Sequence, residues 1–141
     1  MTWVAWALLS AFFAGITAIL AKVGVENVDS SLATAIRTTV VLVLAWVVAL
    51  AVVPAGSLTL PGRRTVLFLV LSGIATGLSW LSYFRALQLG EASRVAPIDK
   101  LSVVFAIVLA GAFLRERITW QHFVGGTLIV AGSLVIAWRA R

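Results

Sequence analysis

The chain has 141 residues, of which 62% are hydrophobic and 11% are charged, with a formal net charge of +6. A soluble domain is about half apolar and about a quarter charged, and at this size it still exposes about 30% of its unfolded surface to water. So much apolar surface excludes a soluble enzyme and a nucleic-acid-binding module, and it predicts a membrane protein whose surface faces lipid. The sequence has no cysteine, which excludes disulfides and thiolate metal sites.

Five apolar segments are long enough to cross the hydrocarbon core of a bilayer, which takes about 20 helical residues. The predicted helices cover residues 3–21, 32–53, 66–84, 95–114 and 118–138. Their apolarity is continuous, whereas the strands of a membrane β-barrel alternate. The connections are short, which favours antiparallel neighbours. We therefore expect an all-α polytopic membrane protein in which residues 1–141 form a single domain, a bundle of five transmembrane helices.

The distribution of Lys and Arg predicts how the chain inserts, because cytoplasmic loops carry an excess of both. The side of the membrane that holds the N-terminus carries four of them: Arg63, Arg64, Arg115 and Arg117. The opposite side carries five: Lys22, Arg85, Arg94, Arg139 and Arg141. So weak a bias favours dual topology, in which two oppositely inserted copies form an inverted pair. The alternative is a fixed orientation with the C-terminus in the cytoplasm.

Three charged residues fall inside the predicted helices, Arg37 in the second and Asp99 and Lys100 in the fourth. At about 1.5 Å per residue they lie at a similar depth, roughly 6–8 Å from the helix ends. Each charge costs about 2.5–3.5 kcal/mol at the centre of a membrane helix, so such groups face partners or a water-filled cavity. We expect Arg37 to pair with Asp99. The alternative is that this pair only fixes helix packing while Lys100 reaches to the interface.

If the charged cluster lines a solute site, two cations and one anion favour a solute with a carboxylate or phosphate, or a zwitterion. Aromatic side chains on the third helix add walls to such a site. The predicted substrate-binding residues are Arg37, Asp99, Lys100, Trp80 and Tyr83. We expect no metal and no cofactor. Pro97 is predicted to shape the start of the fourth helix, and His122 is predicted to lie at the interface.

Glycines predict where helices pack closely, because small residues let membrane helices approach each other. The third predicted helix carries Gly73 and Gly77, and the fifth carries Gly125, Gly126 and Gly132. The glycine-rich fifth helix is therefore a candidate contact in a homodimer. Packing within one bundle is the alternative.

Several short motifs follow one another at a characteristic spacing. They are Tyr83-Phe84-Arg85-Ala86-Leu87, Gly90-Glu91-Ala92-Ser93, Val95-Ala96-Pro97-Ile98, Arg115-Glu116-Arg117-Ile118-Thr119 and Gly125-Gly126-Thr127-Leu128-Ile129-Val130-Ala131-Gly132. With these motifs the chain resembles, over nearly its whole length, a single EamA-type unit of the drug/metabolite transporter superfamily. It is most similar to the short bacterial and archaeal transporter group. The resemblance implies secondary transport of small metabolites by alternating access in an inverted assembly of two units.

Taken together, these observations predict a multi-pass protein of the cytoplasmic membrane that works as a homodimer. We expect it to transport a small polar metabolite, to have no nucleic-acid partner and to catalyse no reaction. Two alternatives stay open. One is a flippase-like subunit for a lipid-linked sugar, and the other is an accessory membrane subunit that transports nothing.

Overall fold

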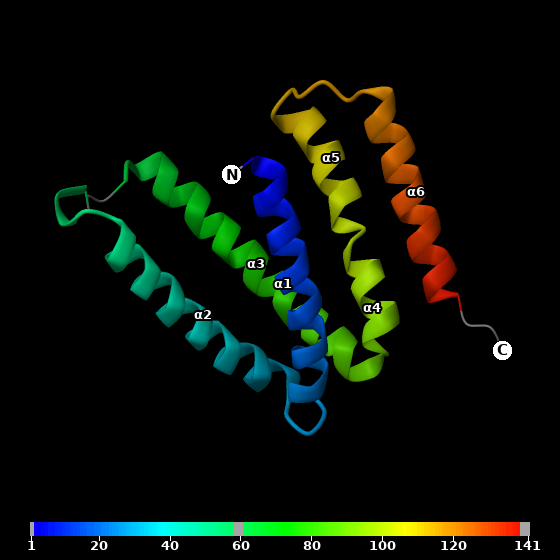
Figure 1. Ribbon diagram of the computed structural model, residues 1–141, viewed down its shortest axis with the longest axis horizontal. Coiled ribbons are helices and arrows are strands. Elements are labelled where there is room, and N and C mark those ends of the chain that lie inside the picture. Colours follow the sequence, from blue (N-terminus) through cyan, green and yellow to red (C-terminus); the bar gives the residue numbers. More distant parts are fainter. Residues whose placement is uncertain (1, 58–60, 139–141) are drawn as a thin grey trace. The chain divides into compact units, whose positions relative to one another are not determined.

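The computed structural model describes residues 2–57 and 61–138, and these residues form helices joined by short connections (Figure 1). The elements are α1 (Trp3–Gly24), α2 (Ser30–Val52), the short 3-10 turn η1 (Ala55–Ser57), α3 (Arg63–Leu89), α4 (Ala92–Asp99), α5 (Ser102–Phe113) and α6 (Trp120–Ala137). The described residues contain five spans long and apolar enough to cross a membrane, with α4 and α5 together making one. The all-α membrane fold is therefore confirmed. Arg139 and Arg141, which entered the charge count, lie outside the described residues.

The ends of the spans differ from the predicted boundaries by a few residues, and the differences are largest at ends that carry charged residues. Helix α3 begins at Arg63 and ends at Leu89, so it is longer at both ends than the predicted 66–84. A helix continues past the hydrocarbon core until a cap or turn stops it, and a boundary placed at the first charge is therefore too short. At the start of α2, the Asp29 Oδ1 accepts hydrogen bonds from the backbone N–H groups of Ser31 and Leu32, at 2.8 and 3.3 Å. This N-cap fixes where α2 begins.

The helices divide into two compact units, one made of Ala21–Gln88 and the other of the described residues before and after it. In the first unit, Val25, Phe84 and Leu87 are buried at the ends of α1 and α3. Lys22 Nζ donates a hydrogen bond to the carbonyl oxygen of Leu87 at 2.7 Å. Because the last carbonyls of a helix have no partner within it, Lys22 caps the C-terminal end of α3. Gln88 ties the same two segments together, since its Nε2 donates to the Val28 carbonyl at 2.7 Å.

In the second unit, the fourth span is broken into α4 and α5 at Lys100 and Leu101 (Figure 1). This corrects the single predicted helix 95–114, which placed Pro97 at its start. The helix begins earlier, at Ala92, so Pro97 lies inside α4. A proline inside a helix has no N–H to donate, and its ring clashes with the carbonyl four residues back. Four residues after Pro97, the Leu101 N–H bonds to the Ile98 carbonyl at 3.0 Å, three residues back, which is a tight turn instead of an α-helical bond.

Helix α6 packs against α4 and α5. The buried hydroxyl of Ser133 donates a hydrogen bond to the carbonyl oxygen of Pro97 at 2.9 Å. Gly126 faces α5, because a Cβ atom added there would lie 4.0 Å from Cγ2 of Val104. A Cβ atom added at four other glycines would meet no described atom within 4 Å; these are Gly73, Gly77, Gly125 and Gly132. Their role in helix packing or in a dimer contact stays a prediction.

Candidate functional site

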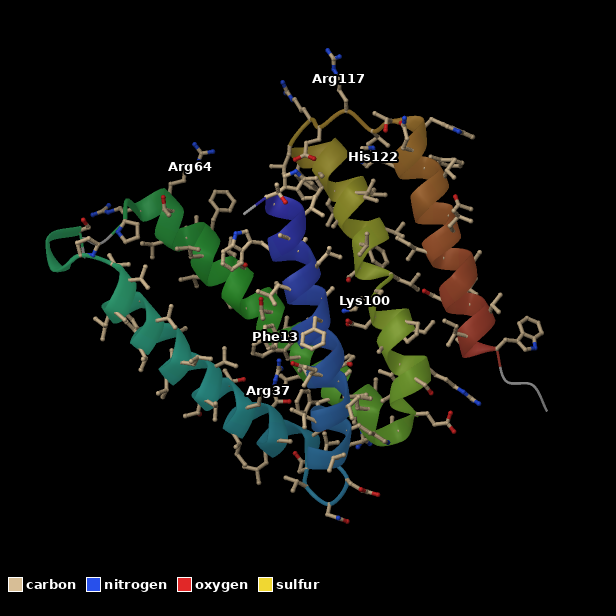
Figure 2. The ribbon with its side chains drawn as sticks, viewed as in Figure 1. Phe13, Arg37, Arg64, Lys100, Arg117 and His122 are labelled. Atoms are coloured by element: carbon tan, nitrogen blue, oxygen red, sulfur yellow. The ribbon has the colours of Figure 1, made fainter. Side chains whose placement is uncertain are left out.

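The Arg37 side chain lies inside the second span, on α2, and points toward α3 (Figure 2). It is seven residues past Ser30, which is about 10 Å along the helix. Its guanidinium carbon lies 4.2 Å from the ring centroid of Trp80 and 5.5 Å from that of Phe84. Trp80 and Phe84 are four residues apart on α3 and therefore lie on the same face of that helix. The two helices thus hold a cation against an aromatic wall.

The electrostatics of this cluster leave the Arg37 guanidinium available. Within Ala21–Gln88, no described carboxylate lies within 4.0 Å of it. A cation–π contact is worth about 0.5–2 kcal/mol, which is less than the cost of bringing a bare cation into the membrane. The contact with Trp80 is made to the ring, and no hydrogen bond from the Arg37 guanidinium N–H groups is found among the described residues of its unit. Arg37 therefore keeps the donors that would bind a carboxylate or phosphate.

Tyr83 lies beside Phe84, with the ring centroids 6.5 Å apart in an edge-to-face arrangement. Both Tyr83 and Trp80 are partly exposed, whereas Phe84 is buried. Arg37 and Trp80, two of the predicted site residues, thus lie together within one unit. Phe84 was missed, although its spacing of four residues from Trp80 was a usable signal in the sequence.

Asp99 and Lys100 lie where α4 ends, at the break in the fourth span, and Figure 2 labels Lys100 there. Lys100 Nζ forms an ion pair with Asp99 Oδ2 at 3.3 Å, and the side chains are 56% and 35% exposed. Among the described residues, Lys100 is thus the ion-pair partner of Asp99. The expected Arg37–Asp99 pair joins residues of the two different units, and it stays a prediction.

The backbone at the break is also part of this candidate site. Inside a bilayer, a non-helical backbone is tolerated only where protein covers it or where it lines a cavity. Here the Ser133 hydroxyl from α6 satisfies the Pro97 carbonyl, while the charged side chains of Asp99 and Lys100 follow two and three residues later. Broken helices of this kind form the binding sites of many secondary transporters. Ser133 was missed in the sequence because it resembles the hydroxyls that bond within their own helix.

The model of the EamA-like transporter family matches residues 1–138. The chain belongs to this family. The resemblance inferred from the short motifs is thereby confirmed, and so is the assignment to a family of membrane transporters. No solved structure was found to match this EamA-family chain.

Relatives of this EamA-family chain carry transporter names. A protein of Sinorhizobium sp. named "Uncharacterized transporter in cobO 3'region" is 51% identical over 139 residues, which are 96% of each chain. A "Probable terminal-alkyne amino-acid exporter" of Streptantibioticus cattleyicolor is 35% identical over 81 residues, which are 55% of this chain and 26% of that protein. The "Uncharacterized transporter YvbV" of Bacillus subtilis is 32% identical over 83 residues, 59% of this chain and 27% of that protein. The chain thus matches one transporter over its full length and about a quarter of two longer ones.

Proposed function

We propose that this chain is one unit of a secondary transporter that carries a small anionic or zwitterionic metabolite across the cytoplasmic membrane by alternating access. The observation that carries the proposal is the Arg37 guanidinium, which lies 4.2 Å over the Trp80 ring with no described carboxylate beside it in its unit. A cation inside a membrane span, with no described carboxylate beside it in its unit, is suited to binding an anionic group that arrives from outside.

The chemistry of the site favours a solute with a carboxylate. The planar guanidinium offers two parallel N–H donors, which match the two oxygens of a carboxylate or phosphate. Asp99 and Lys100 on the other unit supply an anion and a cation of their own. We propose that Arg37 holds the carboxylate of a zwitterion, and that Asp99, in its own unit, is suited to accept from an ammonium group. The relative named as a probable amino-acid exporter supports this solute class.

The proposed working form is an inverted homodimer. The four-to-five distribution of basic residues on the two sides gives a weak topological signal, which permits both orientations of one chain. Two oppositely oriented copies reproduce the symmetry that larger transporters obtain from inverted repeats. The open surface at Gly125 and Gly132 on α6 supports this helix as the contact between copies.

The test uses purified protein reconstituted into liposomes, after a thermal-shift screen of amino acids and organic acids has identified a binding solute. Arg37→Gln is expected to lower transport at least about tenfold, the equivalent of one charge-assisted hydrogen bond. Arg37→Lys should also transport poorly, because an ammonium does not bind a carboxylate through two parallel bonds. Trp80→Leu should raise KM, since the guanidinium then loses the ring that orients it.

Arg64→Gln is the matched control. Arg64 is also an arginine beside an aromatic ring, at 6.0 Å from Phe68, but it lies at the start of α3 and outside the proposed site. Its loss should leave transport near that of the unmodified protein. If Arg37→Gln transports as well as Arg64→Gln does, the proposed site is wrong. If well-folded protein in liposomes transports no solute, whichever way the chains are inserted, the accessory-subunit alternative is favoured.

A further inference from the structure

A groove runs between α5 and α6, in the unit that does not contain Arg37. One pocket along it has a volume of about 380 Å³ and is lined mostly by apolar side chains, among them Val104, Val108, Phe123 and Val130; we call it the apolar part. A second pocket of about 310 Å³ includes three ionisable residues, Glu116, Arg117 and His122; we call its ionisable end the mouth. The two parts share Ile107, Ile118 and His122 in their walls. Of the two adjoining pockets, one is therefore lined mostly by apolar side chains and the other carries ionisable groups.

The position of the groove relative to the bilayer follows from the start of α6. Trp120 and Phe123 stack there with their ring centroids 5.4 Å apart, and Trp120 is exposed. Tryptophan is enriched at the membrane–water interface, so this end of the groove lies at headgroup level. From His122 to Val130 the groove follows eight residues of α6, which is about 12 Å. Half of a hydrocarbon core is about 15 Å, so the apolar part lies within one leaflet.

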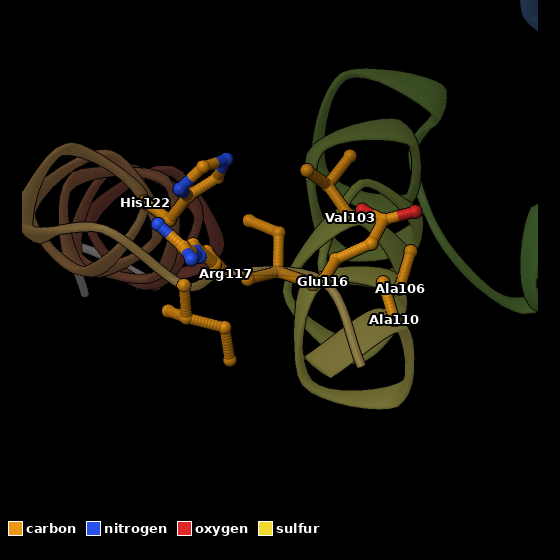
Figure 3. A pocket seen from close by; sticks show the side chains of 8 residues that line it. Val103, Ala106, Ala110, Glu116, Arg117 and His122 are labelled. Atoms are coloured by element: carbon orange, nitrogen blue, oxygen red, sulfur yellow. The ribbon is translucent and has the colours of Figure 1, made fainter. Parts of the chain in front are cut away.

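The charges at the mouth are separated across it. Arg117 and His122 lie beside α6, whereas Glu116 lies beside α5 (Figure 3). Among the described residues, Glu116 forms no salt bridge with the arginine that follows it in the sequence. The Nδ1 of His122 accepts from the Thr119 backbone N–H at 3.1 Å, so the neutral ring carries its proton on Nε2. The mouth thus has cationic and N–H donors on one side and a carboxylate acceptor on the other.

We propose that this groove binds a phospholipid with an ethanolamine headgroup. The phosphate lies against Arg117 and the Nε2–H of His122, the ammonium lies against Glu116, and one acyl chain fills the apolar part. The positive end of the α6 dipole adds to the attraction for the phosphate. An anionic lipid would satisfy Arg117 but would leave Glu116 without a donor. An apolar helix from a second copy would fill the apolar part and leave both charges at the mouth unpaired.

The experiment is native mass spectrometry of the full chain in detergent, with equal amounts of phosphatidylethanolamine, phosphatidylcholine and phosphatidylglycerol added. The unmodified protein is expected to retain phosphatidylethanolamine best, because a trimethylammonium cannot donate a hydrogen bond to Glu116 and a glycerol headgroup has no cation. Arg117→Gln should weaken this retention about tenfold, the equivalent of one charge-assisted hydrogen bond. Arg115→Gln removes a charge from the same loop but not from the groove wall, and it should leave retention unchanged.

Two further variants test the apolar part and the acidic side of the mouth. Thr127→Phe fills the groove and should expel the lipid, whereas Leu128→Phe on the neighbouring, exposed position should not. Glu116→Gln should abolish the preference for ethanolamine over glycerol. Equal retention of all three lipids by the unmodified protein would overturn the proposal. The proposal would also be overturned if Thr127→Phe dissociated a dimer while phosphatidylethanolamine stayed bound. That result would mean that a second copy, and not a lipid, fills the groove of the unmodified protein.

Discussion

The hydroxyl of Ser133 on α6 donates a hydrogen bond to the backbone carbonyl of Pro97 on α4, 2.9 Å away and 36 residues earlier in the chain. Most of the other side-chain hydroxyl bonds in the spans stay within their own helix, as Thr34, Thr76 and Thr127 show. The Ser133 bond instead joins two helices just before a break in one of them. It therefore ties α4, the first part of the fourth span, to α6.

Removing the Ser133 hydroxyl should destabilise the protein moderately. The Pro97 carbonyl keeps a partial partner in the Lys100 N–H at 3.2 Å, so Ser133→Ala should lower the free energy of unfolding by about 1 kcal/mol, the low end for a buried bond. Thermal unfolding in detergent, followed by tryptophan fluorescence, measures the change. Ser133→Thr retains a hydroxyl and should unfold close to the unmodified protein. An unchanged Tm in Ser133→Ala would contradict this role.

Lys22 should matter more to stability than an ordinary surface cation. Lys22→Met removes a charged donor from the Leu87 carbonyl and should cost about 1.5–3 kcal/mol, as for other bonds to charged groups. Arg94→Met is the control, because Arg94 pairs with Glu91 on the surface at 3.1 Å and should contribute less than about 1 kcal/mol. The difference between the two variants in chemical unfolding measures the effect of the cap. Equal losses would show that Lys22 contributes only as a charge.

The N-cap of α2 should make stability depend on pH in the acid range. Hydrogen bonds from the backbone of Ser31 and Leu32 lower the pKa of Asp29 below its ordinary value of 3.8. Because the pKa of Asp29 is lower in the folded than in the unfolded state, the carboxylate stabilises the fold fully at pH values above the unfolded-state pKa. This stabilisation is lost as the pH falls through the folded-state pKa. The Tm difference between the unmodified protein and Asp29→Ala should thus be full at pH 7 and shrink below about pH 3.8. A difference that stays constant down to pH 2 would argue against the titration of Asp29.

Asp99→Asn should separate transport from stability. Its described ion pair with Lys100 is half-exposed, and such pairs contribute about 0–1 kcal/mol, so Tm should change little. Transport should fall strongly if Asp99 receives the ammonium of the solute. Liposome uptake and unfolding measured on the same preparation compare the two effects. Proportional losses in both would favour a packing role.

Added charges should lock the orientation of the chain. Lysines introduced near Arg63 and Arg64 should fix one topology, and lysines near Arg85 and Arg94 should fix the other. Each locked form alone should be inactive, and co-expression of the two should restore transport, because an inverted pair needs both. Reporter fusions at the C-terminus give the orientation. Full activity of either locked form by itself would rule out the inverted pair.

The number and type of the spans could be predicted because bilayer thickness fixes the length of a continuous apolar helix. The ends could not, since α3 continues through Arg63 and Arg85, where charges reach into the headgroup region. The break after Asp99 was missed for a related reason. With the helix start placed at Val95, Pro97 falls in the first turn, where it is harmless, but the true start at Ala92 puts it inside the helix.

The candidate site was predictable where the chemistry of one residue suffices. A charge at membrane depth points to function, so Arg37, Asp99 and Lys100 could be named, and Trp80 was added as an aromatic residue of the third predicted helix. Contacts that depend on a three-dimensional neighbour could not be predicted. The Ser133 hydroxyl and the Lys22 ammonium both donate to backbone carbonyls of a different helix. Every residue has a backbone carbonyl, so the sequence does not indicate which one accepts.

The break divides the fourth span into two rods of 8 and 12 residues, which are about 12 and 18 Å long, and neither spans a bilayer alone. A tilt of one rod against the other would leave the backbone bonds within each rod intact and would pivot about Lys100 and Leu101. Points near a fulcrum move least, so such a tilt would keep Asp99 and Lys100 at their depth while the outer ends of the rods swing.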